Sequence, residues 1–210
     1  MGKVRARTED ELAARKNEIL ESAKEQLMTM DYDEITLATI AEKTSVSRPT
    51  MYRYYEKKEL VFIDLLIQEY EGLELELRPL LKRKMTKEHF CKKLSSSLWK
   101  RQVLLKLLSL QLPIWKREYD DQMLREFVNR SASYQHTLDD VLKKQFPETT
   151  AEARNMFRIQ FSTYCNSLFV LEHLPDSMVQ EMIDRKVFDD IPGGQEICFQ
   201  GLMLLSTIMD

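Results

Sequence analysis

The sequence predicts an all-α protein. Apolar residues recur at helical spacing along most of the 210 residues, as Ile19, Ala23 and Leu27 illustrate. Only five glycines and six prolines occur, so few residues interrupt long helices. No segment of useful length alternates apolar and polar residues in the manner of a β-strand. We therefore expect helices throughout and no sheet.

Three helices are expected near the N-terminus. The first begins at a capping pattern at Thr8 and ends near Met30. Thr36 caps a second, short helix, and Ser47 caps a third that runs to about Tyr54. Two short helices held on a third by a small apolar core are typical of a helix-turn-helix, which places its second helix in the major groove of DNA.

Prolines and one loop divide the rest of the chain into longer helices. An amphipathic segment after the third short helix is expected to bridge two domains, and Pro79 ends it. The other breaks fall at Pro113, Pro147 and Pro175. The predicted helical segments are 57–78, 115–146, 148–173, 176–186 and 195–209. A further helix begins at Thr86 and is interrupted near 103–112, and a loop is predicted at 189–194.

Side chains of the third short helix divide into an inner and an outer set. Val46, Met51 and Tyr55 are spaced to turn inward. On the outside, Arg48 has the donor fork that suits guanine O6 and N7, and Thr50 suits a base edge. The residues that we expect at the DNA are Thr36, Ser47, Arg48, Pro49, Thr50, Tyr52, Arg53, Tyr54 and Lys58.

Several of these residues have a second interpretation. Tyr52 suits a phosphate contact but also packing, and Arg53 is equally an ordinary solvated charge. Lys58 suits phosphate, since lysine at a helix N-terminus opposes the helix dipole and otherwise has no advantage there. Pro49 suits a thymine methyl group. The basic residues Lys3, Arg5 and Arg7 are expected to form an untethered arm along the DNA backbone or minor groove.

This pattern resembles the N-terminal domain of the TetR (tetracycline repressor) family over about residues 12–62, most specifically in the sequence S-R-P-T-M-Y-R-Y-Y-E-K-K-E-L that begins at Ser47. The resemblance implies that Thr36, Arg48, Thr50, Tyr52, Tyr54 and Lys58 fall where family members touch DNA. Two positions depart from it: Asp31 and Ser45 stand where the family usually has glycine.

The resemblance also implies two roles for the C-terminal region. Family members dimerise through a four-helix bundle of their last two long helices, and segments 148–173 and 195–209 are apolar on more than one side, as a subunit interface or an intramolecular core requires. Family members also bind a small effector, with the 57–78 helix coupling effector and DNA sites. The aromatic and polar residues expected to line that pocket, each with ordinary core packing as its alternative, are Trp99, Trp115, Tyr119, Phe127, Tyr134, His136, Phe161 and Tyr164.

Composition excludes several other classes. The net charge is −3, and residues 1–58 carry eleven acidic and eleven basic side chains, so bulk charge gives no support to DNA binding. No apolar run approaches the roughly 20 residues that cross a bilayer, and no signal peptide is evident, which favours the cytoplasm. The three cysteines have no metal-site spacing and are expected to be buried. No metal or other cofactor is expected.

We therefore expect a helix-turn-helix DNA-binding domain at 1–58 and an effector-binding and dimerisation domain at 59–210. The predicted protein is a cytoplasmic homodimer that binds a pseudo-palindromic double-stranded DNA site and is released by a small molecule. An enzyme is the first rival, but no catalytic motif supports one. The second rival is a TetR-like helical interaction protein without specific DNA binding, against which the joint presence of Arg48, Thr50, Tyr52 and Lys58 argues.

Overall fold

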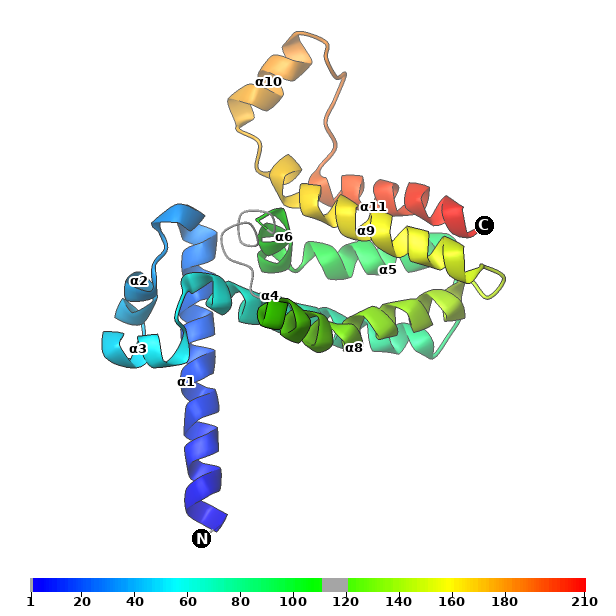
Figure 1. Cartoon of the computed structure of the whole chain (residues 1–210). Helices are drawn as coiled ribbons and strands as arrows, with labels where there is room; N and C mark the ends of the chain where they lie inside the picture. The colour runs from blue at the N-terminus through cyan, green and yellow to red at the C-terminus, as the bar shows by residue number, and fades with distance from the viewer. Residues whose placement is uncertain (1, 111–120) are drawn as a thin grey trace. The chain divides into compact units, whose positions relative to one another are not determined.

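Every regular element in the described part of the chain is a helix (Figure 1). The computed structural model describes residues 2–110 and 121–210, with side chains from residue 10 and, after the gap, from residue 123. The predicted all-α class is confirmed. The elements are α1 (Gly2–Thr29), η1 (Tyr32–Glu34), α2 (Leu37–Glu42), α3 (Arg48–Tyr54), α4 (Lys58–Leu77), η2 (Arg78–Leu81), α5 (Lys87–Trp99), α6 (Gln102–Ser109), α8 (Asp121–Gln145), α9 (Ala151–Glu172), α10 (Asp176–Asp184), α11 (Gly194–Leu205) and η3 (Ser206–Met209).

The chain forms two compact units, Met1–Gln68 and Glu69–Asp210. Helix α4 contributes residues to both units, so the division falls inside a continuous helix rather than in a linker. The functional boundary predicted at residue 58 lies at the start of this helix.

The N-terminal unit has a small apolar core. Ile19 and Leu27 on α1, Ile40 on α2 and Met51 on α3 are fully buried. Val46, between α2 and α3, is buried with them. The predicted inward set of the helix-turn-helix is thus confirmed, and the apolar spacing on three helices is what holds α2 and α3 on α1.

Helix α1 is longer than predicted. It begins at Gly2, so the capping pattern at Thr8 lies inside the helix, and the expected untethered arm at Lys3, Arg5 and Arg7 is helical. A capping residue only favours a helix start, whereas glycine and proline actively break helices. Neither occurs between residues 3 and 29, so the helix extends toward the N-terminus.

The C-terminal unit is built around α9. This helix packs against α6, α8 and α11, and α11 packs in turn on α5; α9 and α11 lie side by side in Figure 1. Gly201 permits that approach, since a Cβ there would lie 2.2 Å from the Tyr164 hydroxyl oxygen. The last helix was predicted to reach residue 209, but it ends at Leu205 and continues as η3.

The three cysteines, Cys91, Cys165 and Cys198, are buried and free, as predicted. All lie in the C-terminal unit, and burial raises the pKa of the Cys198 thiol to about 12. None is therefore a reactive thiolate at neutral pH. Among the described helices none is long and apolar enough to cross a membrane.

Candidate nucleic-acid interface

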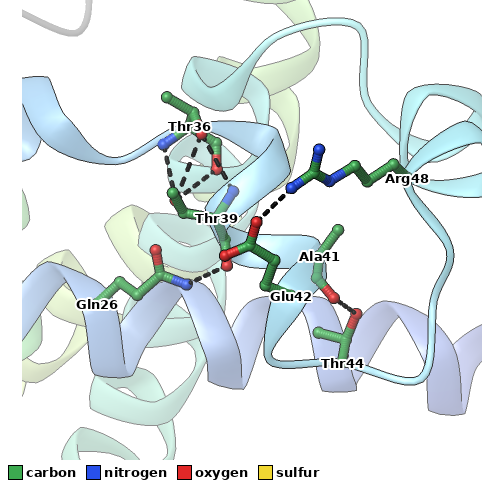
Figure 2. A network of polar contacts seen from close by, with 7 residues as sticks. All are labelled: Gln26, Thr36, Thr39, Ala41, Glu42, Thr44 and Arg48. Carbon is green, nitrogen blue, oxygen red and sulfur yellow. Dashed lines mark hydrogen bonds and ion pairs between the residues drawn. The ribbon is translucent and has the colours of Figure 1, made fainter.

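Thr36 caps α2 in a reciprocal arrangement with Thr39 (Figure 2). The Thr39 amide donates to Thr36 Oγ1 at 3.1 Å, and the Thr36 amide donates to Thr39 Oγ1 at 3.0 Å. Two backbone donors at the start of the helix are satisfied in this way. The predicted cap is confirmed, and Thr36 remains exposed at the surface.

The turn between α2 and α3 is held from α1. The Glu18 carboxylate accepts two hydrogen bonds from Ser45, one from its amide at 2.5 Å and one from its hydroxyl at 2.7 Å. These bonds hold the pKa of the Glu18 carboxyl below its ordinary value. Within the turn, Thr44 Oγ1 donates to the Ala41 carbonyl at 3.0 Å (Figure 2). The same oxygen accepts from the Val46 amide at 3.2 Å.

Glu18 belongs to a polar row on α1, made of Glu18, Ser22 and Gln26, that sequence analysis missed. Ser22 Oγ donates to the Ile40 carbonyl at 2.9 Å, and Gln26 Nε2 donates to the Thr39 carbonyl at 3.0 Å. The three residues recur every four positions, each one residue before the buried Ile19, Ala23 and Leu27. That spacing was the available signal.

Helix α3 exposes the side chains that were predicted for DNA. Ser47, Arg48, Pro49, Tyr52 and Arg53 are exposed, Tyr52 to 58% of its full area. Thr50 and Tyr54 are half-buried. The Ser47 and Thr50 hydroxyl oxygens lie 2.8 Å apart in a hydrogen bond, so Ser47 begins the helix without a side-chain bond to its amides. A polar surface therefore covers one side of α3.

Arg48 lies at the first position of α3 and pairs with Glu42 at the end of α2 (Figure 2). Both side chains are more than half exposed. An ion pair so exposed contributes little to stability, about 0–1 kcal/mol. Its effect is on geometry, because it holds the guanidinium of Arg48 across the turn.

Lys58 binds the backbone of the N-terminal unit. Its Nζ donates to the carbonyls of Tyr32 and Ile35 at 2.7 and 2.8 Å, and it lies 4.3 Å from the centroid of the Tyr32 ring. Two of its three N–H donors thus satisfy carbonyls around η1. This structural role was not foreseen, and it accounts for a lysine at the start of α4.

A second polar group joins α3, α4 and α1. Tyr55 donates to Asp64 Oδ2 at 2.8 Å, and Lys16 Nζ lies 2.7 Å from the same oxygen. Tyr55 is buried, with 5% of its area exposed. The bonds fix the residue that directly follows α3, which supports the inward position predicted for it.

The residues predicted for an effector pocket are dispersed in the C-terminal unit. Tyr134 and Phe161 line a small cavity of about 20 Å³. Trp99 borders an open cleft beside Gly194, and His136 is exposed. Of the remaining two described residues, Phe127 lies 6.4 Å from Tyr70 between ring centroids, and Tyr164 donates to the Ile197 carbonyl at 2.7 Å. The predictions for Trp115 and Tyr119 lie outside the described residues.

Comparison with known proteins agrees with this geometry. Residues 19–65 match the family model of "Bacterial regulatory proteins, tetR family". The match covers α2, α3 and the parts of α1 and α4 that support them. No curated protein sequence matches the chain.

Solved structures share the fold at low sequence identity. The fatty acid degradation regulator FadR from Bacillus halodurans is 18% identical, covers 91% of this chain and 94% of its own, and has a TM-score of 0.59. A TetR/AcrR family transcriptional regulator from Thermobifida fusca YX-ER1 is 14% identical, covers 91% of this chain and 96% of its own, and has a TM-score of 0.60. AmtR from Mycobacterium smegmatis is 17% identical, covers 90% of this chain and 84% of its own, and has a TM-score of 0.50.

A helix-turn-helix on a supporting α1, followed by a larger helical unit, defines a DNA-binding transcriptional regulator. The helix-turn-helix of this chain matches that of the tetR family of bacterial regulatory proteins.

Proposed function

We propose that the protein is a cytoplasmic repressor that binds a pseudo-palindromic operator as a homodimer and is released by a small-molecule effector. The observation that carries the proposal is the exposed polar surface of α3, set on the buried side chains of Val46, Met51 and Tyr55. The proposal includes no catalytic activity and no cofactor.

Different side chains of α3 have different roles in this proposal. Arg48 reads a guanine through its donor fork, and Thr50 and Pro49 approach neighbouring base edges. Tyr52 and Lys58 contact phosphates and set the register on the duplex. The α1 polar row supports these roles, because it fixes the backbone of α2 and the turn from which α3 starts.

Dimerisation is proposed through α9 and α11. Each helix exposes large apolar side chains: Ile159 and Val170 on α9 are 54% exposed, and Leu204 on α11 is 72% exposed. A two-fold dimer presents two α3 helices to half-sites about one helical turn, roughly 34 Å, apart. This spacing is why a pseudo-palindromic operator is proposed.

The effector is proposed to enter the cavity of the C-terminal unit. The cavity is lined from α4, α5, α6, α8 and α9, so a ligand there touches most of the helices of this unit. Helix α4 provides Tyr70 and Leu73 to the lining and also carries Lys58. A displacement of α4 by the ligand is the proposed route of coupling, which typically amounts to about 1–3 kcal/mol.

The test is binding to a duplex from the gene's own upstream region, compared with a shuffled duplex, by fluorescence anisotropy at physiological salt. Arg48→Ala should weaken operator binding by about 1–3 kcal/mol and relax discrimination at one base position. Arg185→Ala, an exposed arginine at the end of α10, is the control with the same charge change. Equal affinity of the unaltered protein for both duplexes would favour a helical interaction protein instead.

A further inference from the structure

The cavity of the C-terminal unit has an apolar side and a polar side. On the apolar side Tyr70 and Tyr134 stack, with ring centroids 4.7 Å apart and planes at 13°. Leucines from α4, α5, α6 and α8 and the Phe161 ring complete it. On the polar side lie Arg158 and Gln135. At about 20 Å³ the cavity has room for one water.

Among the described residues, the hydrogen-bond partner of the Arg158 cation is a neutral side chain. Its Nη2 donates to Gln135 Oε1 at 3.1 Å, and its Nε is buried without a hydrogen-bond partner. Among the described residues no carboxylate forms an ion pair with it. A buried N–H without a partner costs about 1–3 kcal/mol, and an acceptor atom of a ligand or a water would remove this cost.

Two other arginines of the C-terminal unit pair with carboxylates. Arg154, one turn before Arg158 on α9, lies 3.1 Å from Asp139, and Arg101, whose Nε is also buried without a hydrogen-bond partner, lies 3.1 Å from Glu69. Both arginine side chains are less than one-fifth exposed. Arg158, which is half-buried, differs from both in that no carboxylate among the described residues pairs with it.

We propose that the effector is a small organic anion whose carboxylate binds Arg158 and Gln135, with an apolar or aromatic body between the Tyr70–Tyr134 pair and the leucines. The inference rests on the proposed effector-controlled function. A guanidinium presents two parallel N–H donors to a carboxylate, and the Gln135 side-chain amide can donate as well. When the ligand binds, its apolar or aromatic body separates the packed side chains and enlarges the cavity.

The test uses octanoate and phenylacetate, each beside its uncharged primary amide, with inorganic phosphate as a simple anion. Binding is measured by calorimetry and by the shift in unfolding temperature of the full chain. We expect at least one carboxylate to bind tenfold or more tightly than its amide, and phosphate to bind weakly. Equal binding of carboxylate and amide, or no stabilisation by either carboxylate at millimolar concentration, overturns the proposal.

Arg158→Met separates a ligand-binding role from a structural one. If Arg158 binds an anionic ligand and does not stabilise the fold, the variant without ligand unfolds at the same temperature as the unaltered protein or higher, because a buried N–H without a partner has been removed. It then loses carboxylate-induced stabilisation. Arg154→Met, which breaks an ion pair, should lower the unfolding temperature in either case. A large destabilisation by Arg158→Met would assign Arg158 to the fold and overturn the proposal.

Operator binding by the protein without ligand is measured in parallel. The DNA-binding proposal fails if that binding is not specific, whatever the carboxylates do. The anion proposal fails on the calorimetry alone, even where operator binding is specific. The two failures are therefore distinguishable.

Discussion

Glu18 on α1 holds Ser45 in the turn of the helix-turn-helix through two hydrogen bonds, of 2.5 Å to the amide and 2.7 Å to the hydroxyl. The two residues are 27 positions apart in the sequence. The bonds connect the supporting helix to the turn that precedes α3, and α3 carries the side chains proposed to contact DNA.

Replacing Glu18 by glutamine should weaken operator binding while leaving the helix content unchanged. The amide has one acceptor oxygen instead of two, and its nitrogen cannot accept the second bond from Ser45. Anisotropy titrations and circular dichroism measure the two quantities. Glu21→Gln is the control, since Glu21 is exposed on the same helix and lies 3.9 Å from Lys24. Equal affinity of the two variants would contradict a role for the turn bond.

Replacing Glu42 by glutamine should reduce operator specificity. The change frees Arg48 from its ion pair and removes a negative charge beside the DNA-facing surface. Binding to random duplex should tighten, and the slope of log K against log salt should steepen by about one. The unfolding free energy should change by less than about 0.5 kcal/mol. Glu25→Gln, on exposed α1 surface, is the control, and an unchanged ratio of operator to random affinity would count against this role.

Lys58→Met should destabilise the N-terminal unit. Removing Nζ leaves the carbonyls of Tyr32 and Ile35 without that donor, at a cost of about 1–3 kcal/mol. Urea unfolding followed by circular dichroism measures the change, with the exposed Lys43→Met as control. If stability is unaffected and only DNA affinity falls, Lys58 acts as a phosphate ligand alone.

Glu74 should make the stability of the C-terminal unit depend on pH. Burial raises the pKa of this carboxyl, but hydrogen bonds from Arg78, Ser133 and Thr137 offset that effect and leave the pKa below its ordinary value of 4.5. A carboxyl whose pKa is lowered by folding stabilises the fold above the unfolded-state value, and the stabilisation disappears as the pH falls through the folded-state value. The distances from Glu74 Oε1 to the three donors are 2.7–3.0 Å.

Glu74→Gln should therefore cost about 1–3 kcal/mol at pH 7 and progressively less below pH 4.5. Urea unfolding at a series of pH values gives the difference from the unaltered protein. The exposed Glu71→Gln should show no such trend. A penalty for Glu74→Gln that is independent of pH would contradict a role for the charge.

Leu204→Glu should prevent dimerisation. Leu204 is 72% exposed on α11, and a stable interface buries about 1,200–2,000 Å² in which a lone carboxylate is costly. Size-exclusion chromatography with light scattering should report a monomer. Leu75→Glu tests whether any exposed leucine has this effect, because Leu75 is 68% exposed on α4. A dimer that survives Leu204→Glu but not Leu75→Glu would place the interface on α4.

Much of the candidate site follows from sequence because its pattern is local. The inward positions of Met51 and Tyr55 and the cap at Thr36 depend on residues a few positions away, so helical spacing and capping preferences suffice. The predicted start of α1 at Thr8 was wrong. The capping preference of Thr8 was weaker than the tendency of its neighbours to continue the helix.

Sequence by itself determined the helices, their breaks at proline, and the exposed and buried faces of α3, since each depends on interactions between near neighbours. The tertiary structure decided which distant groups meet: Glu18 at Ser45, Lys58 at the Tyr32 carbonyl, and Arg158 at Gln135. A charged side chain in a sequence pattern is equally compatible with solvent, an ion pair or a ligand. Only the fold brings a carboxylate to Arg154 and withholds one, among the described residues, from Arg158.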